Sequence, residues 1–135
     1  MARKKTQTGC PCGLPASFEA CCGRYLGPDA QPAPTAERLM RSRYVAFALG
    51  LEADLLSSWH ASARPAELDL AADAGVVKWV GLEIVACRGG QEGDAEGEVE
   101  FVARYKVGGK AERLHELSRF CREDGRWYYL SGQLF

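Results

Sequence analysis

Residues 98–107 read Glu98-Val99-Glu100-Phe101-Val102-Ala103-Arg104-Tyr105-Lys106-Val107, an alternation of polar and apolar side chains that decides the fold. One face is expected to carry the apolar members Val99, Phe101, Ala103, Tyr105 and Val107. A period of two is typical of a strand that packs one face on a core and turns the other toward water. The segment therefore predicts an antiparallel sheet with a single buried face.

Three further strands are expected around this one, over residues 76–86, 111–122 and 126–131. In the first of them, one side is expected to carry Val76, Val80, Leu82, Ile84 and Ala86. The dipeptide Asp124-Gly125 between the last two is a strong signal for a tight hairpin turn. Consecutive strands joined by short turns predict an antiparallel meander.

The chain before the sheet follows a helical period instead. Thr35 is expected to cap a helix whose arginines lie largely off its apolar face. That face is expected to carry Met40, Tyr44, Phe47, Ala48 and Leu51. After Gly50 a second helix is expected over residues 52–60, and residues 61–75 are expected to form a loop with room for a short helix. Helices followed by a meander predict an α+β fold with the helices on one face of a curved sheet.

The N-terminal region holds a cysteine cluster, Cys10-Pro11-Cys12-Gly13 and then Cys21-Cys22-Gly23. Such close spacing suits thiolates that converge on one metal better than it suits disulfide geometry. Four thiolates fill a tetrahedral zinc shell, so the predicted ligands of a structural Zn²⁺ are Cys10, Cys12, Cys21 and Cys22. A redox dithiol and an iron–sulfur cluster are the alternatives. Gly13 and Gly23 are expected to occupy turns of positive φ.

Three regions follow from these patterns. Residues 1–26 are expected to form the zinc-binding knuckle, which replaces an apolar core that so short a segment cannot build. Residues 27–34 contain three prolines and read as a linker. Residues 35–135 are expected to form the α+β domain. On this two-module view, Cys21→Ser should unfold the knuckle and leave most of the α+β domain intact.

The cysteine pattern resembles the SEC-C motif, the zinc knuckle at the C-terminus of the SecA translocation ATPase and in many other bacterial proteins. Essentially the whole chain resembles the bacterial YchJ-like family, through Leu39-Met40-Arg41-Ser42-Arg43-Tyr44, Trp59-His60, Ser118-Arg119-Phe120 and Gly125-Arg126-Trp127-Tyr128-Tyr129. The resemblance implies a SEC-C knuckle followed by a domain of the nuclear-transport-factor-like (cystatin-like) fold, a curved sheet cupped around helices. Relatives of that fold use the cup as an enzyme pocket, a ligand site or a dimer surface, so the fold does not choose an activity.

Polar residues that could serve a ligand in the cup are Arg43, Tyr44, Trp59, His60, Glu116 and Arg119. His60 is either a general base in the cup or a helix-end residue that complements the helix dipole. His115 and Glu116 are neighbours on a strand and point to opposite faces, so they cannot act as a pair. Arg43 could bind an anion, anchor a buried carboxylate such as Glu116, or form a surface ion pair.

Three function classes remain open. The first is a non-enzymatic binding protein, whose knuckle docks a protein partner and whose cup takes a peptide or small ligand. The second is a small-molecule hydrolase or isomerase acting in the cup, which needs His60 or Glu116 to face the cavity. The third is a ribosome- or nucleic-acid-associated module that uses the basic arm Arg3-Lys4-Lys5 and the helix arginines.

Composition narrows these classes. With 17 basic and 18 acidic residues, the formal net charge of −1 disfavours a nucleic-acid partner. No apolar run reaches the roughly 18–20 residues that span a bilayer. The basic N-terminus is not followed by an apolar stretch, unlike a secretory signal. We therefore expect a cytoplasmic protein without membrane insertion.

Overall fold

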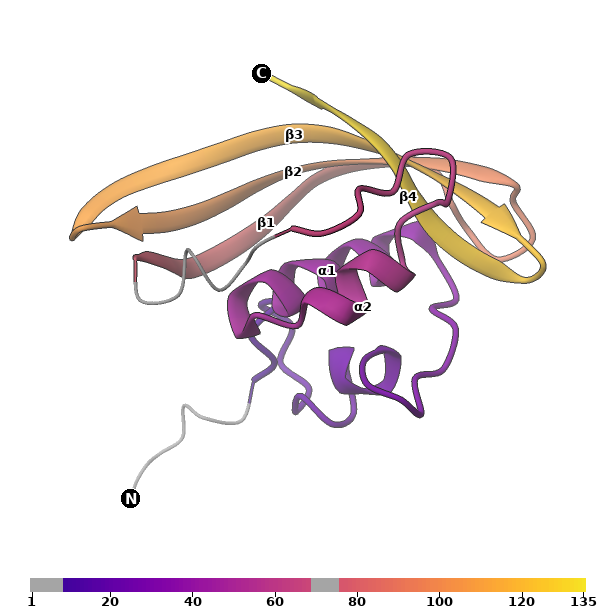
Figure 1. The fold of residues 1–135 in the computed structure, drawn as a ribbon, viewed down its shortest axis with the longest axis horizontal. Coiled ribbons are helices and arrows are strands. Elements are labelled where there is room, and N and C mark those ends of the chain that lie inside the picture. The colour runs from indigo at the N-terminus through magenta and orange to yellow at the C-terminus, as the bar shows by residue number, and fades with distance from the viewer. Residues whose placement is uncertain (1–8, 69–75) are drawn as a thin grey trace.

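The computed structural model describes residues 9–68 and 76–135. Its elements are a 3₁₀ helix η2 (Cys22–Tyr25), two α-helices and four strands. The helices are α1 (Ala36–Leu49) and α2 (Glu52–Ser57), and the strands are β1 (Val77–Gly89), β2 (Glu96–Val107), β3 (Lys110–Glu123) and β4 (Arg126–Leu134). Figure 1 shows the sheet arching over the two helices, with the N-terminal segment on their other side.

The four strands form one antiparallel sheet in the order β1-β2-β3-β4, so the predicted meander is confirmed. The turn between β3 and β4 has positive φ at both central residues, 52° at Asp124 and 80° at Gly125. Positive φ at both positions gives a two-residue turn the twist that matches its flanking strands. The hairpin signal in the sequence is therefore confirmed.

Strand β1 departs from the expected alternation because it contains two register shifts, between Trp79 and Gly81 and between Ile84 and Ala86. A bulge places one extra residue on a strand and moves the following side chains to the other face. Trp79, rather than Val80, therefore packs on the core with Leu82 and Ile84. Val80 is 49% exposed, so the expectation that it shares a face with Leu82 is wrong.

Helix α1 has the predicted N-cap, because Thr35 Oγ1 accepts a hydrogen bond of 3.1 Å from the backbone N–H of Arg38. It ends at Gly50, whose φ of 74° is left-handed and whose N–H bonds the carbonyls of Ala46 and Phe47. Helix α2 stops at Ser57, three residues earlier than expected. Beyond it Trp59 forms a parallel bridge with Tyr129 of β4, so pairing with the sheet edge replaces the last helical turn.

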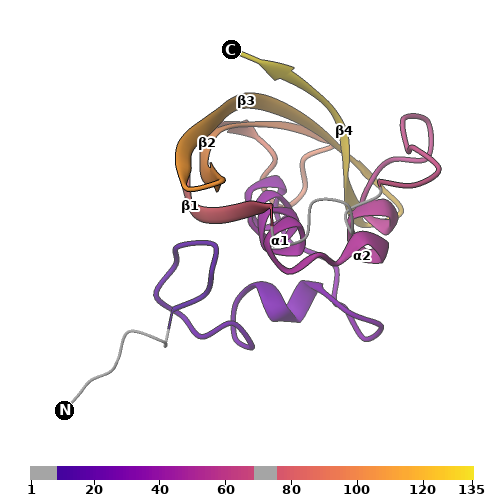
Figure 2. The same ribbon diagram turned by 60° about the vertical axis from the view of Figure 1, so that its left-hand side comes forward.

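Helix α1 is buried on two sides, because the sheet curves around it on one side and the N-terminal segment covers the other (Figure 2). Arg43 is only 3% exposed and Val45 is fully buried, whereas Ala48 is exposed. The apolar face that the sequence predicts for α1 is thus narrower than the buried surface of the helix and partly in the wrong place. Burial on two sides explains the difference, since no one stripe describes a helix with two neighbours.

One buried cluster contains the four N-terminal cysteines together with residues of α1 and of the sheet, Leu39 and Phe101 among them. The N-terminal segment therefore packs against the rest of the molecule. The predicted boundaries at residues 26 and 34 stay a prediction.

The loop after α2 contains no helix over residues 61–68. Residues 69–75, which could also have held the short helix allowed for in the sequence analysis, lie outside the described residues. None of the described helices has the length and apolar character that crossing a bilayer requires.

Candidate functional site

Tight turns bring the cysteines of the N-terminal segment together. Cys10 N–H bonds the carbonyl of Leu14 at 3.1 Å and Gly13 N–H bonds the carbonyl of Cys10 at 3.0 Å. Gly13 has the expected positive φ, 101°. Gly23 is not among the glycines of positive φ, so that expectation is wrong. Glycine is needed there for space, since a Cβ would lie 2.8 Å from the carbonyl oxygen of Phe18.

The four Sγ atoms of Cys10, Cys12, Cys21 and Cys22 lie within 4.8 Å of one another, and all four residues are buried. Cys12 Sγ and Cys21 Sγ are 3.7 Å apart, and all six cysteines of the chain are free thiols. Zn–S bonds of about 2.3 Å at tetrahedral angles separate neighbouring sulfurs by about 3.8 Å. The Cys12–Cys21 separation matches this value, and all four sulfurs are near enough to one another to hold one metal ion.

The thiols affect one another strongly. The hydrogen bond between Cys12 and Cys22 acts on the two thiols in opposite directions. It lowers the pKa of Cys12 to about 5 and raises the pKa of Cys22. Burial, together with the neighbouring thiols, raises the pKa of Cys21. One thiolate thus suppresses ionisation of the others. A divalent cation reverses this, because its charge favours deprotonation of every coordinating thiol.

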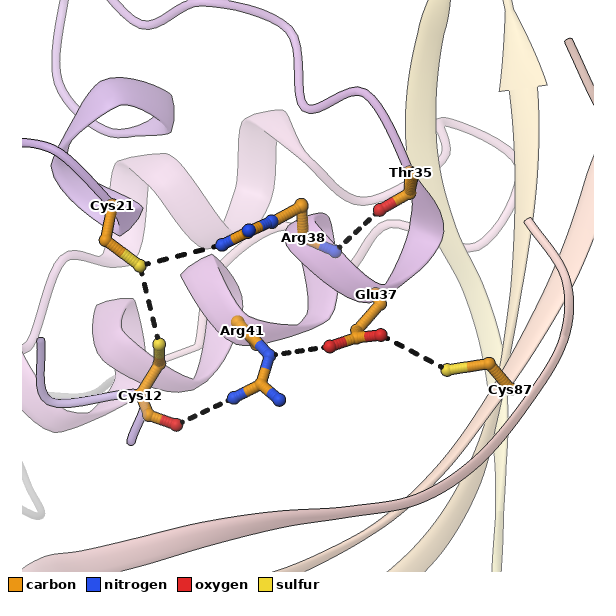
Figure 3. A network of polar contacts seen from close by, with 7 residues as sticks. All are labelled: Cys12, Cys21, Thr35, Glu37, Arg38, Arg41 and Cys87. Atoms are coloured by element: carbon orange, nitrogen blue, oxygen red, sulfur yellow. Dashed lines mark hydrogen bonds and ion pairs between the residues drawn. The ribbon is translucent and has the colours of Figure 1, made fainter. Parts of the chain in front are cut away.

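Two arginines of α1 reach the cysteine cluster, as Figure 3 shows. Arg41 Nη1 donates to the carbonyl of Cys12 at 3.0 Å, and its Nε donates to Glu37 Oε2 at 2.9 Å. Arg38 Nη1 lies 3.8 Å from Cys21 Sγ. This role of Arg41 could not be predicted from the sequence, because no local pattern links residue 41 to residue 12.

A second site lies between α1 and the concave face of the sheet. This aromatic pocket has a volume of about 290 Å³. Its lining consists of Met40, Arg43, Tyr44, Phe47, Trp59, Trp79, Phe101, Ala103, Leu114, Glu116, Ser118 and Tyr129. A mostly apolar concavity with a few polar groups is the usual form of a small-molecule site, and this volume is at the lower end of the range.

Arg43 is the buried cation of the aromatic pocket. Its Nη1 donates to the carbonyl of Leu55 at 2.9 Å and to Ser58 Oγ at 2.6 Å. Its guanidinium carbon lies 5.0 Å from the ring centre of Trp59 and 4.5 Å from that of Tyr129. Burial lowers the pKa of Arg43 to about 10, and the nearby Tyr129 and Glu116 only partly offset this. The side chain is therefore charged at neutral pH.

Glu116 is the acid of the aromatic pocket. Its Oε2 accepts hydrogen bonds from Ser118 Oγ at 2.6 Å and from Tyr129 Oη at 3.2 Å. Burial and the charge of Glu116 raise the pKa of Tyr129 to about 12, so its hydroxyl remains a donor at neutral pH. Among the described residues no ion pair joins Glu116 to Arg43, so the arginine does not anchor this carboxylate directly.

Trp59 adds an unpaired donor. Its Nε1–H is buried and has no hydrogen-bond partner among the described residues. A buried donor without an acceptor costs about 1–3 kcal/mol. Such groups are rare in folded proteins and mark places where a water, an ion or a ligand completes the structure.

The aromatic pocket contains four of the six residues expected in the cup, Arg43, Tyr44, Trp59 and Glu116. His60 lies outside it, with Nε2 2.7 Å from Glu123 Oε2 and Nδ1 2.7 Å from Ser62 Oγ. Arg119 is exposed and points away from the concave face toward Glu98.

Sequence reasoning missed Ser118 as a pocket residue, although its position two residues after Glu116 on one strand face was a usable signal.

Residues 35–132 match the family model described as YchJ, middle NTF2-like domain. A UPF0225 protein of Chromobacterium violaceum is 67% identical, over 97% of this chain and 96% of its own. A UPF0225 protein of Methylibium petroleiphilum is 52% identical, over 93% of this chain and 88% of its own.

Two solved structures share the fold. A SEC-C motif containing protein from Rhodopseudomonas palustris matches with a TM-score of 0.80 and 31% identity, over 93% of this chain and 98% of its own. The crystal structure of a SEC-C motif containing protein from Psychrobacter arcticus matches with a TM-score of 0.76 and 31% identity, over 96% of this chain and 84% of its own. The expected fold, a curved sheet packed on helices behind an N-terminal cysteine knuckle, is thereby confirmed.

Proposed function

The chain belongs to the YchJ-like family of SEC-C motif proteins, and from that premise we propose that it is a non-enzymatic binding protein. In this proposal a structural Zn²⁺ holds the knuckle and the aromatic pocket binds a small ligand. The observation that carries the proposal is a charged Arg43, 3% exposed, in a pocket where no described carboxylate pairs with it. Buried charges are normally paired, and a ligand can supply the missing partner.

The zinc part of the proposal draws on the donor set. The cysteine cluster offers four buried sulfurs within 4.8 Å of one another, enough to fill a tetrahedral shell with protein ligands alone. A filled thiolate shell is typical of structural zinc rather than of catalytic zinc. Docking of a protein partner on the knuckle stays a prediction.

Binding is favoured over catalysis by where the titratable groups lie. Both histidines of the chain are outside the aromatic pocket, each held by a carboxylate, His60 by Glu123 and His115 by Glu100. Of the two residues that a hydrolase or isomerase was expected to use, His60 and Glu116, only Glu116 lines this pocket. The Oε2 atom of that carboxylate already accepts two hydroxyl hydrogen bonds.

The test is a titration of the ¹⁵N-labelled protein with small aromatic fragments, followed by ¹H–¹⁵N correlation spectra. The indole N–H signals of Trp59 and Trp79 report on the pocket, and that of Trp127, which bonds the carbonyl of Pro34, is the internal reference. Saturable shifts confined to the first two would support the proposal. Fragments that shift no pocket signal at roughly millimolar concentration would contradict it.

Neighbouring residues on opposite faces of β2 provide matched variants for this titration. Ala103→Leu adds volume inside the pocket, whereas Arg104→Ala changes the exposed face. We expect fragment affinity to fall about tenfold in the first variant and to stay unchanged in the second. Equal affinities in both variants would place binding elsewhere. If Ala103→Leu fails to fold, the map of shifted signals in the unmodified protein decides whether the fragments bind in the aromatic pocket.

A further inference from the structure

The guanidinium of Arg43 presents one free edge. The rings of Trp59 and Tyr129, whose centres are 5.1 Å apart, both pack against this guanidinium, and its Nη1 donates to Leu55 and Ser58. The edge formed by Nε and Nη2 has no acceptor among the described residues. That edge matches two carboxylate oxygens in a bidentate pair, which a point charge such as ammonium does not match.

Glu116 offers the opposite chemistry at the same pocket. Both hydroxyl hydrogen bonds fall on Oε2, so Oε1 has no donor among the described residues. Glu116 and Arg43 are close enough for the carboxylate to raise the pKa of the arginine, yet they form no ion pair within 4.0 Å. Both residues line the aromatic pocket of about 290 Å³, so a ligand in it can meet a fixed positive group and a fixed negative group.

The rest of the aromatic pocket is apolar. Tyr44 and Phe47 of α1 contact the ring of Trp79, and Phe101 and Leu114 complete the lining. Aromatic walls of this kind favour a ring-bearing or branched apolar body through offset and edge-to-face contacts. The ligand thus needs an apolar body with an anionic group and a cationic donor at one end.

We propose that the aromatic pocket binds an aromatic α-amino acid, with its carboxylate on the free edge of Arg43, its ammonium on Glu116 Oε1 and its ring among the aromatic side chains. This inference rests on the proposed function, because it names the ligand class of the same pocket. The zwitterion is matched by the two opposite charges, whereas a simple carboxylate would leave Glu116 unpaired and a simple amine would leave Arg43 unpaired.

A series of four probes tests the ligand class. L-Phenylalanine carries both charged groups, 3-phenylpropionate lacks the ammonium, 2-phenylethylamine lacks the carboxylate, and benzyl alcohol lacks both. Affinities are measured from the indole N–H shifts of Trp59 and Trp79, with Trp127 as the reference. We expect L-phenylalanine to bind about tenfold or more tightly than each truncated probe, since each lost pairing leaves a charged group unmatched.

Glu116→Gln is the matched variant, because glutamine keeps an oxygen for Ser118 and Tyr129 and removes only the charge. It should reduce the affinity for L-phenylalanine about tenfold and leave that for 3-phenylpropionate within about twofold. Arg43→Gln should weaken the binding of both L-phenylalanine and 3-phenylpropionate. If Arg43→Gln does not fold, the probe series and Glu116→Gln decide alone.

The outcomes separate the two proposals. Equal binding of all four probes would overturn the amino-acid inference and leave small-ligand binding standing. Unchanged affinity for L-phenylalanine in Glu116→Gln would overturn the role of Glu116 and with it the zwitterion match. If none of the four probes binds while unrelated fragments shift the pocket signals, the amino-acid inference fails alone. If no small molecule shifts them, both proposals fail.

Discussion

At the scale of single residues, the carboxylate of Glu116 depends on the absence of a side chain across the strand pair. Gly132 lies opposite Ser118 on β4. A Cβ at Gly132 would overlap the Glu116 carboxylate and lie 2.6 Å from the Tyr129 hydroxyl. Gly132 thus makes room for the acid of the aromatic pocket, a role that its position near the end of the chain does not suggest.

Gly132→Ala should therefore destabilise the protein by about 1–3 kcal/mol, because the added methyl group displaces the Glu116–Tyr129 hydrogen bond. The measurement is the free energy of unfolding from a denaturant titration. Gly81→Ala is the control, since Gly81 also lies in the sheet and a Cβ there meets nothing within 4 Å. Equal losses of stability in the two variants would contradict the steric account of Gly132.

At the scale of elements, α1 connects the two candidate sites. Its Arg38 and Arg41 reach the cysteine cluster, while Arg43 enters the aromatic pocket. Residues two positions apart on a helix point in clearly different directions. The arginines at 41 and 43 consequently serve opposite sides of one helix, and the helix holds the two sites in a fixed relation.

Arg41→Ala should weaken metal binding at the cysteine cluster by about 10-fold to 100-fold, because groups that hydrogen-bond around a metal shell orient its ligands. Arg41 fixes the backbone of Cys12 through the 3.0 Å hydrogen bond to its carbonyl. The measurement is the rate and extent of zinc transfer to a competing chelator. Arg104→Ala, which removes an exposed arginine that faces Glu83, should leave both unchanged. Transfer as slow in Arg41→Ala as in the unmodified protein would argue against this role.

At the scale of the whole molecule, the knuckle and the sheet domain share one buried cluster. Removing the knuckle would take the four buried cysteines out of this cluster and break the hydrogen bond from Arg41 of α1 to the carbonyl of Cys12. The packing therefore favours coupled unfolding over the independent knuckle that the sequence suggests.

We expect one zinc per chain by elemental analysis, and a melting temperature that falls by about 10 °C on chelation. Cys21→Ser should lower the melting temperature by a similar amount. The circular dichroism signal of the sheet should disappear in the same transition in which the knuckle unfolds. A variant whose sheet melts at the unmodified temperature would restore the two-module view. Iron in place of zinc would move an electron-transfer role to the front.

Short-range chemistry explains which features of this protein could be predicted from its sequence. The spacing of the cysteines sets a tetrahedral donor cluster, the alternation in residues 98–107 sets a half-buried strand, and Asp124-Gly125 sets the hairpin turn. Each of these signals lies within a stretch of 13 residues or fewer, where bond geometry and steric limits act directly. Arg43, Tyr44, Trp59 and Glu116 could be named as cup residues because the family resemblance implies a cup, whereas the helical period alone places the arginines largely off the apolar face.

The tertiary structure decided the remainder, because it depends on contacts between residues far apart in sequence. Bulges in β1 exchange Val80 for Trp79 on the concave face. Pairing of Trp59 with Tyr129 closes the aromatic rings over Arg43 and draws His60 away toward Glu123. Periodicity reports only which face a residue occupies, whereas burial and partnership depend on what the other elements place against that face.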